Sequence, residues 1–415
     1  MRPWPAIVAA AVCLAVVIPV ARHFASAEDS PLRAARAASA KGKSGPSQDP
    51  AMLQGIQFER LGLGRTEVTA PGPEGRLARL TVDPNLQRGT LRLFHDHGIP
   101  DGAMVLMELD TGRVLVYATQ QSKGPPKDMC ADASAPAASV FKIVTASALV
   151  EQAGLGPETR QCYHGGTDRL DSGDLVDNPQ KDKWCATLSE AMGRSLNTVF
   201  ARLAARNLDG PKLEATAGAL GFGFPFQLDA PVEPSRITIP EGELGFARTA
   251  AGFWNTTLSP IHAAMLASAI AKDGNMIRPV LVQSVTDAKG TVYKAPSGAQ
   301  VIRKTVRPQT AAAVREMMEA TVATGTGYKA FHDASGKPFL PGIRVAGKTG
   351  TLTRASTQQY YTWFVGFAPS TEPKVAIASL VVNKPKWRTR ANVLARDVLR
   401  MYFAAKSAPG VTRPF

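Results

Sequence analysis

Cysteine and histidine are scarce in this sequence: its 415 residues include four cysteines and six histidines. They form neither a C-x-x-C pair nor a histidine-rich cluster, so a metal site of the usual zinc-binding spacing is not expected. Acidic residues are also few relative to basic ones, 34 against 48, which gives a formal net charge of +14. This charge favours anionic surroundings such as nucleic acid, acidic phospholipid or cell-wall polymer, and it does not distinguish between them.

The N-terminus narrows this choice. Trp4–Val20 contains no charged residue, and its 17 residues are just long enough to cross a bilayer as a helix. The following Ala25-Ser26-Ala27 also fits a signal-peptidase site. Residues 1–27 are therefore predicted to be either a retained membrane anchor or a cleaved signal peptide. Both alternatives carry the rest of the chain across a membrane, so nucleic acid is not expected as a partner.

Export would place the three cysteines beyond this segment in an oxidising compartment. Cys162 and Cys185 flank a loop rich in Gly, Asp and Asn. A crosslink would stabilise such a loop most, so we predict a disulfide between these two residues. Free buried thiols are the alternative.

Composition separates an N-terminal part with little to bury from a long globular part. Residues 28–79 are predicted to be a flexible linker followed by a short segment, Ala51–Arg79, that is broken by Gly and Pro and forms a strand or two. Regular patterns begin near Leu80, so we predict one catalytic domain over residues 80–408 and a C-terminal tail over residues 409–415.

Apolar periodicity predicts strands near both ends of the globular part and helices between them. A hairpin is expected from Ala103–Leu109 and Val114–Ala118, around Asp110-Thr111-Gly112. The other predicted strands are Ile343–Ala346, Tyr360–Phe367 and Val375–Val382, and the predicted helices are Ser139–Gln152, Leu188–Leu208, Ile261–Lys272, Ala311–Val322 and Ala391–Ala405. The expected fold class is therefore α+β, with an antiparallel sheet of about five strands flanked by helices and an all-α lobe inserted between its N- and C-terminal strands.

A serine and a lysine stand three residues apart in the otherwise apolar stretch APAASVFKIVTA, residues 135–146. On a helix this spacing places Ser139 and Lys142 on one face, one turn apart. A serine hydroxyl needs a neighbouring base to become a nucleophile, and a lysine is a base only where burial or nearby positive charge lowers its pKa. The alternative is a helix-capping serine beside a lysine whose side chain extends into solvent.

Two further short motifs follow this pair. Ser195-Leu196-Asn197 could provide a hydroxyl that relays a proton and an amide that holds a lysine and a substrate carbonyl. Lys348-Thr349-Gly350-Thr351, at the end of a predicted strand, could bind a carboxylate, and Gly350 would let a peptide lie along the strand. The backbone N–H groups of Ser139 and Thr351 could form an oxyanion hole. Each motif alone is weak evidence, whereas their order and spacing together are specific.

Together the three motifs resemble those of the transpeptidase domain of penicillin-binding proteins, which are relatives of the serine β-lactamases. The resemblance extends over about Leu80 to Ala405. It includes five further stretches, namely Thr81–Gln87, GAMVLMELDTGRVLVYAT, SPIHAAMLASAIAKDGNMIRPVLV, Gly325-Thr326-Gly327 and WFVGFAP.

The resemblance implies a peptidoglycan D,D-transpeptidase that binds stem peptides and β-lactams and requires no cofactor, metal or nucleotide. Ser139 would attack the penultimate D-Ala of a stem peptide and form an acyl-enzyme, with Lys142 as the base. Ser195 would pass the proton to the leaving amine, and Asn197 would hold Lys142 and the substrate amide. The terminal carboxylate, or that of a β-lactam, would be bound by Lys348, Thr349 and Thr351, and Gly350 would complete the substrate-binding strand.

The same resemblance implies a location and possible partners. Because it begins near Leu80, we expect neither a glycosyltransferase domain nor the large N-terminal module of typical monofunctional members. The catalytic domain is expected on the periplasmic side of the inner membrane, held there by the N-terminal segment or released if that segment is cleaved. A partner protein of cell-wall synthesis could replace the absent module.

Three alternatives stay open. A D,D-carboxypeptidase would differ only in that water, and not an amine, resolves the acyl-enzyme. A serine β-lactamase is disfavoured, because Glu241–Gly245 does not match the Glu and Leu-Asn pattern of one hydrolase class and Asn197 replaces the Val of another. A non-catalytic β-lactam sensor would call for several membrane spans or a fused cytoplasmic effector.

Overall fold

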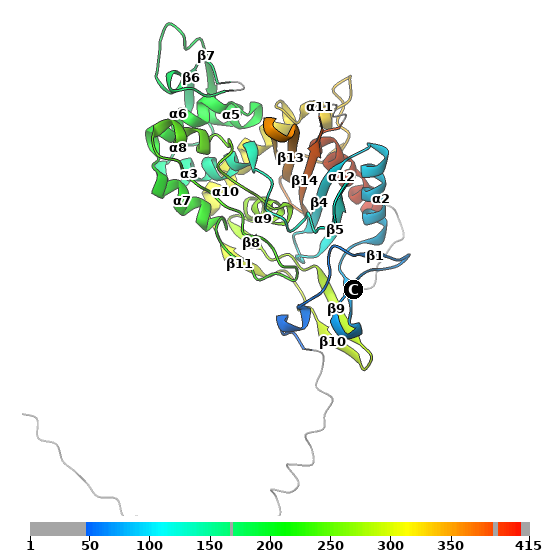
Figure 1. Cartoon of the computed structure of the whole chain (residues 1–415). Coiled ribbons are helices and arrows are strands. Elements are labelled where there is room, and N and C mark those ends of the chain that lie inside the picture. The colour runs from blue at the N-terminus through cyan, green and yellow to red at the C-terminus, as the bar shows by residue number, and fades with distance from the viewer. Residues whose placement is uncertain (1–46, 167–168, 385–388, 408–415) are drawn as a thin grey trace, which may run out of the picture. The chain divides into compact units, whose positions relative to one another are not determined.

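A five-stranded antiparallel sheet forms the centre of the structure, a computed structural model that describes residues 47–166, 169–384 and 389–407 (Figure 1). Its strand order is β12-β13-β14-β4-β5. The strands are β4 (Asp101–Glu108), β5 (Val114–Gln120), β12 (Ala346–Arg354), β13 (Gln359–Ala368) and β14 (Val375–Asn383). Since β14 pairs with β4, the sheet is closed by strands from the two ends of the domain. The predicted α+β fold class is confirmed.

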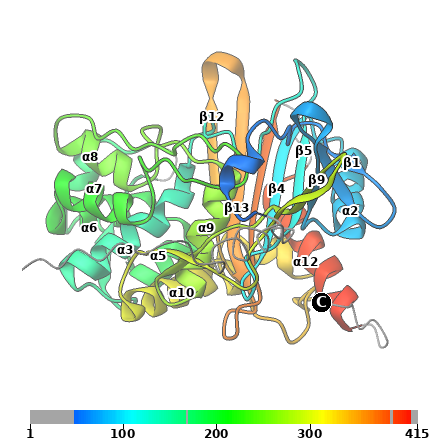
Figure 2. The ribbon, with the colours of Figure 1, turned by 90° about the horizontal axis from the view of Figure 1, so that it is seen from below.

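Helices cover both faces of this sheet (Figure 2). On one face lies α9 (Pro260–Ala271), every residue of which is buried. On the other face α2 (Pro84–Asp96) and α12 (Ala391–Ser407) pack together. Successive side chains of a strand point to opposite faces, so a strand covered on both sides is apolar throughout. This accounts for β14, all nine residues of which are buried.

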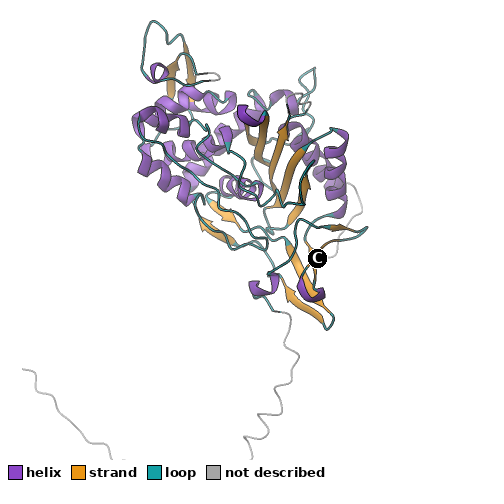
Figure 3. Ribbon diagram, in the orientation of Figure 1, coloured by secondary structure: helices purple, strands orange, loops and turns teal. Residues whose placement is uncertain are grey.

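The middle of the chain forms a helical lobe beside the β12 edge of the sheet (Figure 3). It contains α3 (Lys142–Ala153), α4 (Ser172–Leu175), α5 (Leu188–Arg194), α6 (Asn197–Asn207), α7 (Gly210–Ala219), α8 (Glu243–Ala250) and α10 (Pro308–Ala323). The short elements elsewhere are α11 (Tyr328–Phe331), η1 (Pro50–Leu53), η2 (Pro73–Gly75), η3 (Ala138–Phe141) and η4 (Ala355–Thr357).

The prediction of one helix over Leu188–Leu208 is wrong, because the structure has two helices there. α5 ends at Arg194, and Ser195 then adopts a left-handed conformation with φ 59° and ψ 42°. Leu196 is extended, and α6 begins at Asn197. A left-handed serine interrupts the helix, whereas the apolar periodicity on both sides of it continues. Periodicity alone therefore does not indicate the break.

The strand predicted at Ile343–Ala346 begins only at Ala346 and continues to Arg354 as β12. Ile343 and Val345 are apolar because they pack into the core cluster beneath α12. The backbone carbonyl of Arg344 accepts a hydrogen bond from Ser370 N at 2.8 Å, outside the ladder of the sheet. The K-T-G motif consequently lies inside the strand and not at its end.

A second five-stranded sheet has the order β1-β2-β3-β9-β10. Its strands are β1 (Gly62–Leu63), β2 (Val68–Pro71), β3 (Leu77–Leu80), β9 (Val282–Asp287) and β10 (Gly290–Lys294). In this sheet Leu77 lies opposite Thr286, 209 positions later in the chain. Residue 80, the predicted start of the domain, lies within β3, and most of the predicted flexible linker falls outside the described residues.

Two small two-stranded sheets complete the strands: β6 (Arg160–Tyr163) pairs with β7 (Trp184–Thr187) in a hairpin, and β8 (Asn275–Ile277) pairs with the non-consecutive β11 (Val301–Lys304). Cys162 and Cys185 are bonded across the first hairpin, and Cys130 is a buried free thiol. The loop between β6 and β7 is held by the fully buried Arg202, which donates to Asp182 at 2.9 Å and to three backbone carbonyls.

The membrane prediction concerns residues that the structure does not describe. In the described ranges, no helix has both the length and the apolar character needed to span a bilayer. The apolar run Trp4–Val20 lies outside those ranges.

Candidate active site

Ser139 lies in η3, at the point where the chain turns into α3. The preceding Ala138 has a positive φ of 52°, and α3 begins at Lys142 and ends at a left-handed Gly154. Gly252 makes close approach possible here, because a Cβ at this position would lie 2.4 Å from the carbonyl oxygen of Ala138. The backbone around the serine is therefore fixed from both sides.

Lys142 is fully buried, and its Nζ lies 3.0 Å from Ser139 Oγ. Nζ also donates to Asn197 Oδ1 at 2.8 Å and to the backbone carbonyl of Ala251. The last two groups only accept hydrogen bonds, whereas a serine hydroxyl can donate one. A neutral amine has two N–H groups and one lone pair, so this arrangement suits a neutral lysine that accepts the Ser139 proton.

The electrostatic surroundings of Lys142 also favour its neutral form. Burial away from water lowers its pKa well below the ordinary value, and the positive charge of Lys348 lowers it further. The aromatic ring of Phe200 lies 5.6 Å from Nζ. Lys142 is thus buried and not solvent-exposed, and its lowered pKa favours the neutral amine.

The S-x-N motif spans the break between α5 and α6. The left-handed conformation of Ser195 and the extended Leu196 bring the side chains of Ser195 and Asn197 to the same site. Ser195 Oγ accepts a hydrogen bond from Lys348 Nζ at 2.9 Å, while Asn197 contacts Lys142. The motif therefore joins the two lysines.

The K-T-G motif on β12 lies directly against the start of the serine helix. A Cβ on Gly350 would be 3.3 Å from side-chain carbons of Ala138, Val140 and Trp363. The indole of Trp363 on β13 donates to the carbonyl of Pro136 at 2.9 Å. A side chain at this position would crowd these neighbours, so glycine favours the close packing of β12 on η3.

Lys348 is also fully buried, and burial lowers its pKa to about 7. Its Nζ donates to Ser195 Oγ and, at 2.8 Å, to the carbonyl of Thr349. The ammonium therefore points towards the helical lobe and the strand backbone. Its predicted role in binding a substrate carboxylate stays a prediction.

These elements enclose a cavity of about 560 Å³. Six of the predicted site residues line it: Ser139, Ser195, Asn197, Thr349, Gly350 and Thr351. Lys142 and Lys348 do not line the cavity and are buried behind these residues. No group of three or more His, Cys, Asp or Glu side chains that could hold a metal occurs in the described part of the chain.

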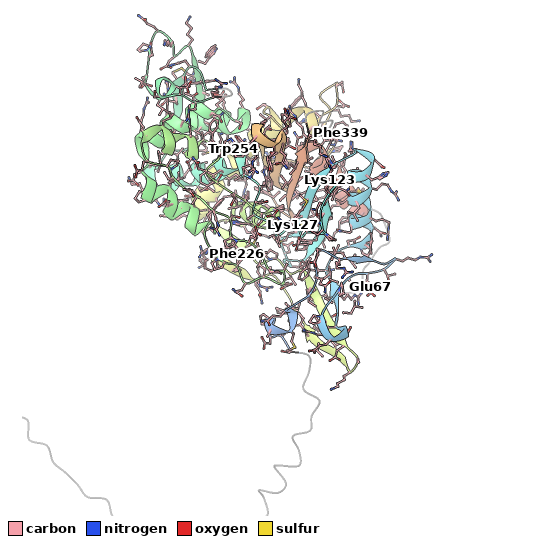
Figure 4. All side chains as sticks on the ribbon, in the orientation of Figure 1. Glu67, Lys123, Lys127, Phe226, Trp254 and Phe339 are labelled. Carbon is pink, nitrogen blue, oxygen red and sulfur yellow. A yellow bond between two sulfur atoms is a disulfide. The ribbon has the colours of Figure 1, made fainter. Side chains whose placement is uncertain are left out.

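Several cavity residues were not identified from the sequence as site residues. Trp254, labelled in Figure 4, lines the cavity and stacks with the guanidinium of Arg354, which lies 5.3 Å from its ring centroid. Thr326 Oγ1 contacts Thr349 Oγ1 at 2.5 Å, and only the resemblance of Gly325-Thr326-Gly327 had pointed to it. The lining also includes Gly252, Phe253, Leu352, Thr353, Thr362, Trp363, Arg390 and Asn392. Residues joined to the site by long-range folding carry no short motif that could reveal them.

Comparison with known proteins agrees with this architecture. The penicillin binding protein transpeptidase domain matches residues 102–400. Peptidoglycan D,D-transpeptidase PbpA of Mycolicibacterium smegmatis is 27% identical over 354 residues, with 75% of this chain and 68% of that protein covered.

Two solved structures share the fold. The D,D-transpeptidase domain of a peptidoglycan glycosyltransferase from Eggerthella lenta has a TM-score of 0.65 and 26% identity, covering 80% of this chain and 83% of that one. Penicillin-binding protein A from M. tuberculosis, solved as its penicillin G acyl-enzyme complex, has a TM-score of 0.62 and 24% identity, covering 81% of each chain. The domain match covers most of the chain, and this chain therefore belongs to the penicillin-binding protein transpeptidase family.

Proposed function

We propose that this protein is a peptidoglycan D,D-transpeptidase that works through a Ser139 acyl-enzyme and is inhibited by β-lactams. The observation that carries the proposal is the buried Lys142 amine, which lies 3.0 Å from Ser139 Oγ and has two acceptor groups for its own N–H bonds. A base held neutral beside a hydroxyl is what nucleophilic catalysis by serine requires.

In the first half-reaction Ser139 Oγ bonds to the carbonyl carbon of the penultimate D-Ala, and its proton moves to Lys142 Nζ. The peptide C–N bond then breaks. The leaving nitrogen receives a proton through Ser195, whose hydroxyl lines the same cavity. Terminal D-Ala departs, and the acyl group remains as an ester on Ser139.

Substrate positioning follows from the β12 edge. A peptide that lies along this strand would meet the hydroxyls of Thr349 and Thr351. The backbone N–H groups of Ser139 and Thr351 are our candidates for the oxyanion hole, since β12 packs on η3 at Gly350.

In the second half-reaction the amine of another stem peptide attacks the ester. The C–O bond to Ser139 breaks, the serine recovers a proton, and a cross-link results. We further propose that residues 1–27 carry the domain to the extracytoplasmic side of the membrane and that a wall-synthesis partner brings it to its substrate.

The test is intact-mass analysis after incubation with penicillin G, followed by peptide mapping of the adduct. We expect one stable adduct on Ser139 of the wild type and none on Ser139→Ala. Ser147→Ala is a matched control, because Ser147 lies on the same helix, is buried and bonds only to the carbonyl of Ile143 in the described structure. Unchanged adduct formation by Ser139→Ala would refute the nucleophile assignment.

A second measurement separates the possible outcomes of the acyl-enzyme. With a stem pentapeptide and an acceptor peptide, a transpeptidase yields the cross-linked dimer, and a carboxypeptidase yields only the tetrapeptide and D-Ala. Rapid hydrolysis of penicillin without adduct accumulation would show a β-lactamase instead.

A further inference from the structure

Arg390 is the one charged side chain among the residues that line the cavity, within the described part of the chain. The two lysines of the site are fully buried behind the wall. Lys348 Nζ already donates to Ser195 Oγ and to the carbonyl of Thr349, and its pKa of about 7 means that it is only partly charged near neutral pH. A bound carboxylate is held best by a group that is always charged, and arginine is such a group.

The residues on both sides of Arg390 make hydrogen bonds to the rest of the domain. The preceding Thr389 is buried, its carbonyl accepts from Asn383 at 3.3 Å and its hydroxyl contacts His97 at 3.1 Å. The following residue, Ala391, donates its N–H to Thr362 Oγ1 at 3.2 Å. Arg390, which is exposed, therefore lies between two hydrogen-bonded neighbours, directly before α12.

The contact between Ala391 and Thr362 connects Arg390 to the sheet beside the K-T-G strand. Thr362, which contacts Ala391, is the cross-strand partner of Thr351. Alternate side chains of a strand share a face, so Thr349 and Thr351 project from one face of β12 and Lys348 from the other. Thr349, Thr351 and Arg390 all line the cavity. The arginine and the two threonines thus line one cavity, and the contact between Ala391 and Thr362 links their supports.

One polar side chain that lines the cavity also has an atom without a hydrogen-bond partner. Asn392 lines the cavity and is 94% buried (6% exposed), and its Oδ1 has no hydrogen-bond partner among the described residues. Buried polar atoms without a partner are uncommon in folded proteins. A guanidinium turned to meet a bound anion has enough N–H groups to donate to this oxygen as well.

We propose that Arg390 binds the free carboxylate of the peptide or β-lactam that acylates the enzyme, with the hydroxyls of Thr349 and Thr351 orienting it. Lys348 instead positions Ser195. This inference rests on the proposed transpeptidase function, because it concerns the substrate of that reaction.

The test compares the acylation of Ser139 by penicillin G with acylation by penicillin G methyl ester, which lacks the negative charge. For the wild type we expect the acid to react much faster than the ester. Arg390→Gln should slow the acid about 10- to 100-fold, the usual effect of losing a charge-assisted hydrogen bond, and should leave the ester rate nearly unchanged. Arg390→Lys, which keeps the charge, should recover part of the acid rate.

The control is Arg344→Gln, since Arg344 is an exposed arginine near β12 that does not line the cavity. It should retain the wild-type preference for the acid. If Arg390→Gln slows acid and ester equally, Arg390 has a structural role and the inference fails. It fails as well if Arg390→Gln retains the full preference for the acid.

A binding measurement keeps this inference separate from the proposed chemistry. In the Ser139→Ala background, N-acetyl-D-alanyl-D-alanine and its C-terminal amide are compared by saturation-transfer NMR. Stronger binding of the acid, lost on Arg390→Gln, supports the inference even if wild-type Ser139 is never acylated. Equal binding of acid and amide would overturn the inference about Arg390. The transpeptidase proposal would still be supported in that case if penicillin forms an adduct on Ser139 of the wild-type protein.

Discussion

Replacement of Lys348 by Met should make the fold more stable near neutral pH while it disables the site. Lys348 is fully buried, and its pKa in the folded protein is lowered from 10.5 to about 7 by burial. Between these two values the unfolded chain binds a proton that the folded protein lacks, so stability must rise with pH across this window. The full difference corresponds to about 5 kcal/mol in the free energy of unfolding.

Methionine has a similar length and no charge, so the variant loses this pH dependence. From pH 7.5 to 9.5 the wild type should gain about 2.5 kcal/mol more unfolding free energy than the variant, because all other titrations cancel in the difference. At pH 7.5 the variant should be more stable by about 1–3 kcal/mol. Removal of Lys348 eliminates a burial penalty of about 4 kcal/mol at this pH. Loss of the hydrogen bonds to Ser195 Oγ and the Thr349 carbonyl offsets part of this gain.

Urea unfolding followed by circular dichroism at pH 7.5, 8.5 and 9.5 measures these differences. The comparison is made in a Lys142→Met background, because the charge of Lys348 also lowers the pKa of Lys142. The Lys142→Met protein is then the reference, and Lys142→Met/Lys348→Met is the variant. Lys329→Met is the control for loss of an exposed lysine. The reasoning would be refuted if the free energy of unfolding changed equally with pH with and without Lys348. It would also be refuted if the variant were less stable at pH 7.5.

Three further predictions concern the rest of the site and its support. Lys142→Ala should slow acylation by penicillin about 10²- to 10⁴-fold, as loss of a general base does; a stopped-flow rate near that of the wild type would point to another base. Replacing Cys162 and Cys185 by Ser opens a crosslink of 23 residues' separation and should lower stability by about 3 kcal/mol; no change in the urea midpoint would contradict this, and thiol counting on the wild type checks the bond. Gly252→Ala should lower both stability and acylation, because φ is +82° and the new Cβ would meet the carbonyl of Ala138 at 2.4 Å; wild-type behaviour in both assays would show that the loop can move.

Four of the five strands of the central sheet could be predicted from the sequence because each has a clear local pattern, whereas β12 was predicted at Ile343–Ala346 and shares only Ala346 with that range. β4 and β5 flank an Asp-Thr-Gly turn, and β13 and β14 are long apolar runs. The three motifs were equally accessible, since each is a short string of chemically distinctive residues. What the motifs share in the folded protein, a single cavity, follows from the sheet joining the two ends of the domain.

Other features depend on contacts between distant residues and left no local signal. The pairing of β3 with β9 joins segments about 200 positions apart, so the strands of Ala51–Arg79 seemed isolated in the sequence. The carbonyl of Ala251 contributes a backbone atom to the site, and a backbone atom has no sequence signature. Arg390 resembles any surface arginine until the contact between Ala391 and Thr362 places it beside the cavity.

The site also concentrates unfavourable conformations. Two of the five non-glycine residues with positive φ in the described chain are Ala138, next to Ser139, and Ser195. Such conformations cost about 1–3 kcal/mol each and persist only where the surroundings impose them. Two buried lysines add a further electrostatic penalty, which Lys348 alone makes about 4 kcal/mol near neutral pH. The rest of the fold must offset these terms, and it does so with a sheet that is covered by helices on both faces. Stabilising substitutions should therefore be found most easily at the motif residues, and each should reduce activity because the proposed mechanism uses the strain and the lowered pKa values to prepare Ser139 for reaction.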